Sequence, residues 1–374
     1  MKILLVGAGG YGSLYVHQLL EHSAEHNVVW EGIVDPYFDA CADKERILQA
    51  GIPVYDTMEA FYNAHTADLA VICTPPFLHC KQSICALEHG SYVLCEKPLA
   101  PTPEEAELMR AAEKKHNKFI AIGYQWSFSA AIRALKEDVL SGKLGAPVLL
   151  KTVVCWPRNR AYYARGTGWG GKISRDGVMI LDSVASNACA HYVHNMLFLL
   201  GKDMESAAEA AEVTGDCLRA NDIENFDTCT LRIRTVAGDT LFFAASHATE
   251  KVREPEFIYQ FENAEVRFSE AEGSQITAFF KNGTVKVYGN PFADTFRKLW
   301  DCMAAIHSEE TPICTVKTAT PHTKLINMIY RTLPVQSFPV DQILENDNNG
   351  LFVKDLFDNI CTAYDRGALL SEIK

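Results

Sequence analysis

The sequence predicts an α/β protein with two domains: an N-terminal, doubly wound parallel sheet and a C-terminal α+β domain with a largely antiparallel, open sheet. Two observations support this fold class. Short, uninterrupted apolar runs alternate with helical patterns through residue 122, as strands buried on both faces of a parallel sheet require. After Gly123 the strands come in pairs joined by turn sequences, which is typical of antiparallel hairpins. We therefore divide the chain into residues 1–123 and 124–374.

The first domain is expected to contain strands and helices in strict alternation. The expected strands are residues 3–6, 28–34, 69–73, 92–95 and 119–122, and the helices between them are residues 12–20, 40–49, 78–89 and one that begins after Thr102. Thr102, Pro103 and Glu105 form a favourable helix start, with an N-cap, an N1 proline and a capping-box acid. Such units have right-handed crossovers, which place helices on both faces of a parallel sheet.

The second domain is expected to mix helices with hairpins. The expected helices are residues 129–140, 186–200, 294–307, 318–331 and 353–368, and a long strand covers residues 148–156. Strands 231–235 and 240–246 flank Ala237-Gly238-Asp239, and strands 276–281 and 284–288 flank Asn282-Gly283, a strong hairpin signal. Residues 157–177 form a loop rich in Arg, Tyr and Gly, and residues 344–350 form a polar loop.

The composition is that of a globular protein. Hydrophobic residues make up 48% and charged residues 22% of the 374 residues, which excludes disorder and fibrous architectures. The net charge of −12 disfavours nucleic acid and anionic membranes as partners. No apolar run approaches the roughly 18 residues of a membrane span, and the first is too short for a signal peptide. The 12 cysteines include no C-x-x-C pair, so we expect a reduced, cytoplasmic protein.

A glycine-rich loop follows the first expected strand. Gly7-Ala8-Gly9-Gly10-Tyr11-Gly12 fits the pattern G-x-G-x-x-G and opens a helix within a strand–helix–strand unit, which is the context that gives the pattern meaning. Gly7 permits the tight turn, Gly9 lets the backbone approach a pyrophosphate, and Gly12 allows close helix–strand packing. The helix N-terminus then faces the negative charge of the ligand. An ordinary glycine-rich turn is the alternative.

An acidic residue stands at the end of the second expected strand. Asp35 is placed where a carboxylate accepts hydrogen bonds from the adenosine ribose hydroxyls of a dinucleotide. A 2′-phosphate there would meet this carboxylate, and no Arg follows before Arg46. We therefore expect NAD as the cofactor, with NADP disfavoured. The alternative is an Asp that only ends a strand before Pro36.

Two further motifs follow later strands of the first domain. Thr74-Pro75-Pro76-x-x-His79 follows the strand at 69–73, and Cys95-Glu96-Lys97-Pro98-Leu99 follows the strand at 92–95. With the glycine loop, these segments resemble the glucose–fructose oxidoreductase/inositol dehydrogenase/MocA (Gfo/Idh/MocA) family over nearly the whole chain. The resemblance implies a nicotinamide-binding Rossmann domain and a second domain whose open sheet supports homodimers or homotetramers. It also implies oxidation of a secondary hydroxyl of a sugar, polyol or related small molecule.

The second domain resembles the family with departures. The family's usual Asp, His and Asp on one helix align with Asn187, His191 and His194, so the His is kept and both acids are replaced. A subgroup is closer, and the matching segments are Gly123-Tyr124-Gln125-Trp126-Ser127-Phe128, Trp156-Pro157-Arg158, Trp169-Gly170-Gly171-Lys172, Asp182-Ser183, Asn187-Ala188-Cys189-Ala190-His191 and Asn195-Met196-Leu197. The missing acids remove the basis for transferring the substrate of inositol dehydrogenases.

The chemistry of these residues suggests an acid–base pair. On a helix, Asn187 and His191 would be spaced i,i+4 and share a face. His191 can take a proton near neutral pH, and Lys97 can polarise the same oxygen, especially where desolvation lowers its pKa. The alternatives are a satisfied core histidine and a solvated lysine. His191-x-x-His194 lacks the third ligand of a zinc site, so no metal is expected.

The loop at 157–177 carries candidate substrate-binding side chains. Its aromatic residues can pack against sugar rings, and its basic residues can bind hydroxyls or a carboxylate; packing against another surface is the alternative. The expected catalytic residues are Lys97, His191 and Asn187. The expected cofactor-binding residues are Gly7, Gly9, Gly10, Tyr11, Gly12, Asp35, Thr74, Pro75, Pro76, His79, Glu96, Lys97 and Gln125. The expected substrate-binding residues are Lys97, Tyr124, Trp126, Arg158, Tyr163, Trp169, Lys172, Asp182, Asn187 and His191.

Together with the resemblance, which implies the reaction and the class of substrate, these observations predict an NAD-dependent oxidoreductase that removes a hydride from a secondary hydroxyl carbon of a sugar, glycoside or polyol. Two alternatives stay open. In the first, NAD is reduced and reoxidised during elimination or epimerisation of a glycoside, so no net NADH forms. In the second, the chain is a nonenzymatic NAD-binding regulator, against which the retained Lys97 and His191 argue.

Overall fold

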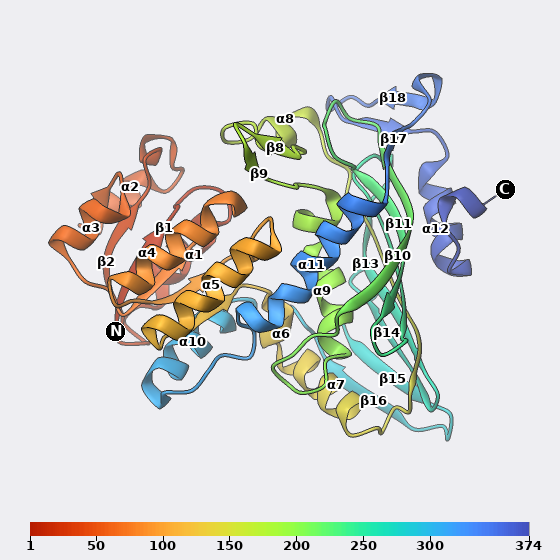
Figure 1. Cartoon of the computed structure of the whole chain (residues 1–374), viewed down its shortest axis with the longest axis horizontal. Coiled ribbons are helices and arrows are strands. Elements are labelled where there is room, and N and C mark those ends of the chain that lie inside the picture. The colour runs from red at the N-terminus through yellow and green to blue at the C-terminus, as the bar shows by residue number, and fades with distance from the viewer. Residues whose placement is uncertain (374) are drawn as a thin grey trace. The chain divides into compact units, whose positions relative to one another are not determined.

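The computed structural model describes residues 1–373, which form two compact units. The first unit contains Met1–Phe128 together with Phe296–Thr320, and the second contains Ser129–Thr295 and the chain from Pro321 onward. Figure 1 shows both units coloured along the chain.

The first unit is built on a six-stranded, wholly parallel sheet. Its strands lie in the order β3-β2-β1-β4-β5-β6, which is the order of a Rossmann fold. The strands are β1 (Lys2–Val6), β2 (Val29–Val34), β3 (Val54–Tyr55), β4 (Leu69–Ile72), β5 (Tyr92–Cys95) and β6 (Ile120–Ile122). The predicted fold class of this domain is confirmed. Of the six strands of this sheet, only β3 was not predicted, because its two residues are too few to show a pattern.

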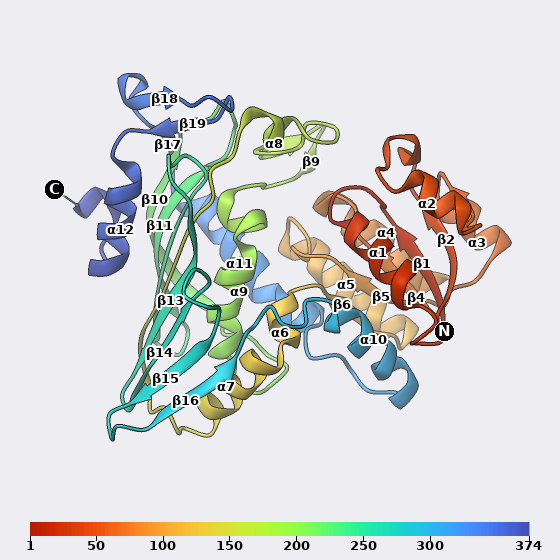
Figure 2. The same ribbon diagram turned by 180° about the vertical axis from the view of Figure 1, so that it is seen from behind.

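Helices flank both faces of this sheet (Figures 1 and 2). They are α1 (Gly12–His22), α2 (Lys44–Gln49), α3 (Met58–Ala64), α4 (His79–Glu88), α5 (Pro103–His116) and α6 (Gln125–Phe128). The Thr102 side chain caps α5 by accepting a hydrogen bond from the backbone N–H of Glu105 at 3.2 Å. The predicted helix at 40–49 was too long, because Phe38–Ala40 forms a 3₁₀ turn and α2 begins at Lys44.

A segment from late in the chain completes the first unit. The sequence-based division places residues 296–320 in the second domain, yet helix α10 (Arg297–Ser308) packs in the first. The apolar side chains of Leu299, Cys302 and Met303 join one buried cluster with Tyr15 and Val16 of α1. An amphipathic helix lies where its apolar stripe is buried, and here that core belongs to the parallel sheet.

Glu113 of α5 provides a test of pH dependence in this unit. Its Oε1 accepts a hydrogen bond from the Ile120 N–H at 2.8 Å, and burial raises its pKa to about 7 against the opposing effects of that bond and of Arg110. Glu113 thus has a higher pKa in the folded protein than its unfolded value of about 4.3. The contribution of such a carboxyl to the stability of the fold is lost as the pH rises through the folded-state pKa.

Glu113→Gln should therefore raise the melting temperature at pH 8 by a few degrees and leave it nearly unchanged at pH 5. About 1 kcal/mol corresponds to roughly 2–4 °C for a domain of 150–250 residues. The exposed Glu107, changed to Gln, is the control in scanning calorimetry at both pH values. An equal shift at pH 5 and pH 8 would contradict the role of ionisation.

The second unit contains a nine-stranded mixed sheet. Its order is β16-β15-β14-β13-β7-β12-β11-β10-β17, and neighbours are antiparallel except β7–β12 and β10–β17. The strands are β7 (Pro147–Cys155), β10 (Ala210–Arg219), β11 (Thr228–Thr235), β12 (Thr240–Ser246), β13 (Arg253–Phe261), β14 (Ala264–Ser269), β15 (Ile276–Phe280), β16 (Val285–Gly289) and β17 (Val335–Ser337). This confirms the largely antiparallel sheet and both predicted hairpins.

Helices lie on both sides of the nine-stranded sheet (Figures 1 and 2). Helices α7 (Ala130–Leu140) and α9 (Ala190–Leu199) lie on one side, with α11 (Val316–Thr332), and α12 (Leu356–Arg366) lies on the other. The side chains of α12 pack with Val153 of β7 and Phe242 of β12 in one apolar cluster. Part of the sheet face on the α12 side is thus covered by the chain's own C-terminal segment.

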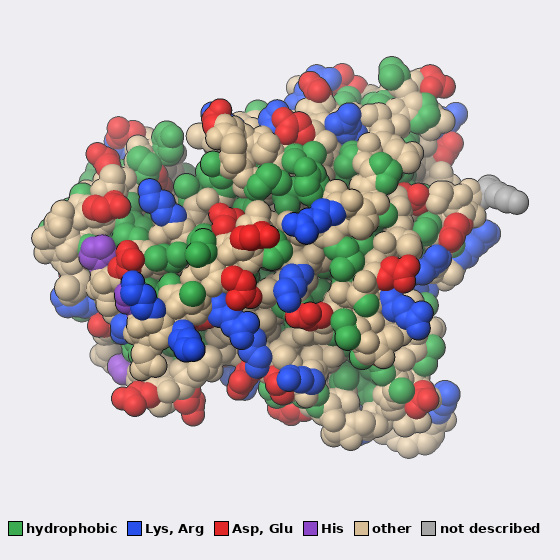
Figure 3. Space-filling model, in the orientation of Figure 1, with side chains coloured by type: hydrophobic (Ala, Val, Ile, Leu, Met, Phe, Trp, Pro, Cys, Tyr) green, Lys and Arg blue, Asp and Glu red, His purple; other side chains and the backbone are tan. Residues whose placement is uncertain are grey.

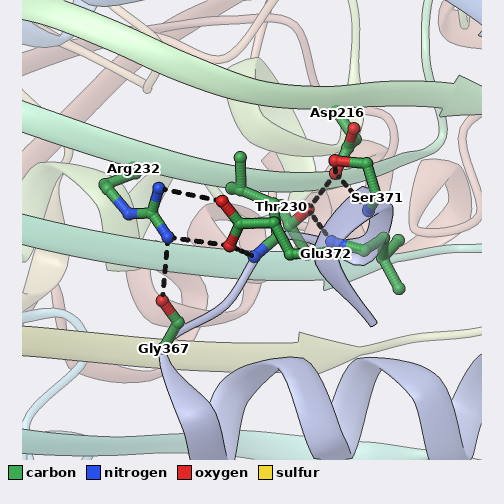
Figure 4. Close-up of polar contacts among 8 residues, drawn as sticks. Asp216, Thr230, Arg232, Gly367, Ser371 and Glu372 are labelled. Atoms are coloured by element: carbon green, nitrogen blue, oxygen red, sulfur yellow. Dashed lines mark hydrogen bonds and ion pairs between the residues drawn. The ribbon is translucent and has the colours of Figure 1, made fainter. Parts of the chain in front are cut away.

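Polar contacts hold this segment to the sheet (Figure 4). Arg232 of β11 pairs with Glu372 at 3.0 Å and donates to the Gly367 carbonyl at 3.3 Å. Asp216 of β10 accepts a hydrogen bond from the Ser371 N–H at 3.0 Å. The expected homodimer or homotetramer, which light scattering would test, stays a prediction.

Two predicted loops and one predicted helix boundary near them differ from the structure of the second unit. Ile343–Glu345 and Leu351–Val353 pair as the hairpin β18–β19, so residues 344–350 are more than a loop. Helix α12 begins at Leu356 because residues 351–353 belong to this hairpin. The predicted loop at 157–177 contains a short helix, α8 (Arg160–Ala164), and Ser174–Arg175 (β8) pairs with Val178–Met179 (β9).

The surface mixes both signs of charge. On the face drawn in Figure 3, Lys and Arg side chains are interspersed with Asp and Glu. Among residues 1–373, no helix has both the length and the apolar character that crossing a membrane requires.

Candidate active site

The glycine loop connects β1 to α1 with the geometry that its sequence predicts. Gly7 has a φ of +87°, a left-handed conformation that favours glycine. A Cβ on Gly12 would lie 2.1 Å from the Gly7 carbonyl oxygen, so only glycine lets the helix approach the strand this closely. By contrast, Cβ atoms on Gly9 and Gly10 would meet nothing within 4 Å. The loop therefore has an open side next to the helix N-terminus.

No acidic residue stands in the first turn of α1, and no side chain caps its N-terminus. Unpaired N–H groups and the helix dipole make such a terminus attractive to an anion. The open side of the loop and this uncapped terminus together fit a pyrophosphate group.

Asp35 lies directly after β2 and faces the same loop. It is buried, and its Oδ2 accepts a hydrogen bond from the Ala8 N–H at 2.9 Å. Its Oδ1 accepts one from the Tyr37 N–H at 2.8 Å. The carboxylate is thus fixed beside the glycine loop, as the sequence predicts.

The loops that follow β4 and β5 are held together by His79. Its side chain is fully buried, with Nδ1 at 2.8 Å from the Pro98 carbonyl oxygen and Nε2 at 2.8 Å from that of Thr74. Burial lowers its pKa. His79 therefore positions the Thr74-Pro75-Pro76 and Lys97–Pro98 segments from within. Lys97 itself is half-buried, and its peptide bond to Pro98 is cis.

A buried polar network joins the glycine loop to Glu96. Its centre is Lys298 of α10, which is fully buried and forms an ion pair with Glu96 Oε1. The Tyr15 hydroxyl donates to the same oxygen at 2.8 Å. Lys298 also donates to the Tyr11 hydroxyl at 3.2 Å, and Tyr11 donates to Gln125 Oε1 at 3.1 Å. Three predicted cofactor-binding residues are thus brought together by a lysine that the sequence did not reveal.

The charges in this network support one another. Burial alone would lower the pKa of Lys298, but the Glu96 carboxylate and Tyr11 outweigh it and raise the pKa above its ordinary value. Lys298 is therefore an ammonium at neutral pH. Burial raises the pKa of Tyr11, so its hydroxyl stays protonated and can donate to Gln125.

In the second unit, His191 follows a distorted helical turn. The predicted helix from residue 186 is a π-helical turn, Val184–Ala188, followed by α9 from Ala190. Asn187 and His191 lie on opposite sides of this junction, so they do not belong to one regular helix, and their placement on a common face stays a prediction. Turns of this kind are frequent at functional sites.

The polar side chains in and just before this turn are held by hydrogen bonds. Asn187 Nδ2 donates to Asp182 Oδ1 at 2.9 Å, and Asp182 Oδ2 accepts from the Gly171 N–H at 2.7 Å. Asp182 is buried, and the preceding Leu181 has a φ of +50°, a strained conformation for leucine that is typical of functional sites. His191 is half-buried at the second position of α9.

The other predicted substrate-binding side chains differ in exposure. Lys172 pairs with Glu224 at 3.0 Å on the surface, whereas Tyr124, Trp126 and Trp169 are buried. The Tyr163 hydroxyl is buried without a hydrogen-bond partner among residues 1–373. These roles stay predictions.

His194 is almost entirely buried, and burial together with His322 and Lys136 lowers its pKa well below the ordinary value. It is therefore neutral and unsuited to accepting a proton. In the described part of the chain, no three His, Cys, Asp or Glu side chains are arranged to hold a metal ion.

Comparison with known proteins adds independent evidence. Residues 1–124 match the Gfo/Idh/MocA family, described as an oxidoreductase family with an NAD-binding Rossmann fold. The D-glucoside 3-dehydrogenase of Escherichia coli (strain K12) is 36% identical over 92 residues, which are 25% of this chain and 26% of that protein. The rhizopine catabolism protein MocA of Rhizobium meliloti is 30% identical over 172 residues, 45% of this chain and 51% of that protein. This chain thus spans about half or less of these two relatives.

Likeness of fold extends through both units. The WlbA dehydrogenase from Bordetella pertussis, solved in complex with NADH and UDP-GlcNAcA, superimposes with a TM-score of 0.72 at 21% identity, covering 88% of this chain and 95% of that one. The family match itself ends at residue 124, so for the second unit the likeness is one of fold. The N-terminal 124 residues of this chain thus match the Gfo/Idh/MocA family, an oxidoreductase family with an NAD-binding Rossmann fold.

Proposed function

We propose that this protein is an NAD-dependent oxidoreductase that removes a hydride from a secondary hydroxyl carbon of a sugar, glycoside or polyol. The observation that carries the proposal is the glycine loop of the parallel sheet, open at Gly9 and Gly10, with Asp35 fixed beside it. The family match of residues 1–124 supports it. The names of D-glucoside 3-dehydrogenase and of the WlbA complex support a sugar-like substrate.

The cofactor would be held mainly by the first unit. The loop amides and the N-terminus of α1 would bind the pyrophosphate, and Asp35 would accept hydrogen bonds from the adenosine ribose. NAD⁺, when bound, supplies the hydride acceptor. The network of Lys298, Glu96 and Tyr11 would hold the glycine loop and the Glu96–Lys97 segment in fixed positions relative to each other.

The proton of the substrate hydroxyl requires a base. We assign this role to His191, and we assign to Lys97 the orientation and polarisation of the hydroxyl oxygen. Asn187, itself fixed by Asp182, would position the base or the substrate. Lys97 belongs to the first unit and His191 to the second, so the test of this pair is functional.

The proposal is tested with a panel of sugars, glycosides and polyols in the presence of NAD⁺, followed by the absorbance of NADH. Substrate-dependent NADH formation supports it. Substrate loss without net NADH would favour the redox-neutral elimination or epimerisation instead. NAD binding without any turnover would favour a regulator.

The cofactor preference gives a second test. Calorimetry should show NAD⁺ binding more tightly than NADP⁺, because Asp35 would repel a 2′-phosphate. Asp35→Ser should weaken NAD⁺ binding about 10-fold or more, the loss expected for hydrogen bonds to a charged group. It should also reduce the difference in affinity between NAD⁺ and NADP⁺. Tighter binding of NADP⁺ by the unaltered protein would contradict the assignment.

A further inference from the structure

The segment between Trp156 and Asp182 contains a ladder in which aromatic rings alternate with guanidinium groups. The Arg158 guanidinium carbon lies 5.7 Å from the Trp156 ring centre and 4.9 Å from that of Tyr162. The guanidinium carbon of Arg165 also lies 3.8 Å from the Tyr162 ring centre and 4.3 Å from that of Trp169. Cation–π contacts of this kind hold a guanidinium in place without neutralising its charge.

The charges of this segment do not balance. Five of its side chains are cationic, and four of them have a carboxylate partner: Arg160 with Glu345 at 2.9 Å, Arg165 with Asp182 at 3.9 Å, Lys172 with Glu224 at 3.0 Å and Arg175 with Asp176 at 3.5 Å. Arg158 alone forms no ion pair with any residue of the range 1–373.

The groups around Arg158 do not supply the missing charge. Its Nε is buried without a hydrogen-bond acceptor among the described residues. Glu254 accepts a hydrogen bond from the Trp156 indole N–H at 2.7 Å and forms no ion pair with Arg158 among the described residues. The neighbouring His247 is fully buried, and burial together with Arg158 and Arg165 lowers its pKa to about 3, so it is neutral.

The ladder is anchored next to the candidate catalytic turn. The Arg158 N–H donates to the His247 carbonyl at 3.0 Å, and His247 Nδ1 lies 2.8 Å from the Trp156 carbonyl oxygen. The Trp156 ring contacts Tyr192, the residue after His191, with ring centres 5.7 Å apart. Arg165 reaches Asp182, the partner of Asn187. Arg158 is half-buried, so a ligand can still reach its side chain.

We propose that Arg158 is the recognition site for a carboxylate on the substrate, and that the preferred substrate is therefore a sugar acid. This inference rests on the proposed function, because it names the class of substrate for the same site. A single excess positive charge matches the single negative charge of a carboxylate. A guanidinium is also a planar fork of N–H donors, which matches a carboxylate in geometry. A phosphate dianion would call for further unpaired donors.

The test compares acidic and neutral sugars of the same shape. NAD⁺-saturated protein is titrated by calorimetry with D-glucuronate against D-glucose and with D-galacturonate against D-galactose. At least one acid should bind about 10-fold or more tightly than its neutral partner. Arg158→Met, which keeps an unbranched apolar side chain of similar length, should remove this difference by lowering the affinity for the acid about 10- to 100-fold. Arg158→Lys, which keeps the charge, should retain part of the preference.

Arg160→Met is the matched control, because Arg160 is exposed and already paired with Glu345; it should behave like the unaltered protein. The inference is overturned if neither acid binds better than its neutral partner, or if Arg158→Met and Arg158→Lys both keep the full preference. Tighter binding of D-glucose 6-phosphate than of D-glucuronate would overturn the choice of a carboxylate.

The two proposals fail in different ways. If neutral sugars are oxidised and no acid is preferred, only the sugar-acid inference fails. If acids bind through Arg158 but no hydride is transferred to NAD⁺, the dehydrogenase function fails and the carboxylate site stands.

Discussion

Replacement of His191 by alanine is expected to lower kcat by about 10²- to 10⁴-fold, the usual contribution of a general base. The affinity for NAD⁺ should change little, because the glycine loop and Asp35 belong to the other compact unit. The measurement is steady-state kinetics with the best substrate of the panel, together with a calorimetric titration of NAD⁺. Near-normal turnover would rule out His191 as the base.

The pH profile distinguishes a base from a merely structural histidine. In the unaltered protein, kcat/KM should rise with pH as the proposed base loses its proton and then level off. In His191→Ala this rise of kcat/KM with pH should disappear, and added imidazole should restore part of the activity. His307→Ala is the control, since His307 is exposed on α10 and its loss should leave the profile unchanged.

Lys97→Met should lower turnover by a similar factor, because Lys97 is proposed to act on the same oxygen. The double variant should lose less than the product of the two single losses, since groups that act as a unit are not additive. Fully multiplicative losses would show that the two side chains act in separate steps.

Several features of the site could be predicted from sequence because each follows from local chemistry. Gly12 had to be glycine because any side chain would collide with the Gly7 carbonyl, and Asp35 was expected at the end of β2. The parallel strands β1, β4 and β5 were recognisable because strands buried on both faces are continuous apolar runs. Such signals depend only on neighbours in the chain.

The features that escaped prediction depend on contacts distant in sequence. The apolar stripe of α10 predicts a buried face but does not say which core buries it, so its return to the parallel sheet was not foreseen. Lys298 on that helix had no visible partner in the sequence, because Glu96 lies about two hundred residues earlier. The π-helical turn before α9 was hidden because its residues also fit a regular helix.

The stability effects of Lys298 and Glu96 are expected to be strongly coupled, because each buried charge is balanced by the other. Lys298→Met should lower the free energy of unfolding by about 3–5 kcal/mol, because it leaves the buried Glu96 carboxylate without its counter-charge. The double variant Glu96→Gln/Lys298→Met should recover most of this loss, since replacing both partners of a buried pair removes the uncompensated charge. Thermal and urea unfolding of the single and double variants measure the coupling between them. Lys81→Met is the control, because Lys81 is exposed on α4.

The same variants separate stability from cofactor binding. Lys298 also donates to Tyr11 in the glycine loop, and that bond is absent from both Lys298→Met and the double variant. If the bond orders the loop for the pyrophosphate, the stable double variant should still bind NAD⁺ more weakly than the unaltered protein. Recovery of both stability and NAD⁺ affinity would mean that Lys298 serves only to neutralise Glu96. Failure of the double variant to regain stability would instead contradict the charge argument, since the two side chains would then contribute through packing rather than as an ion pair.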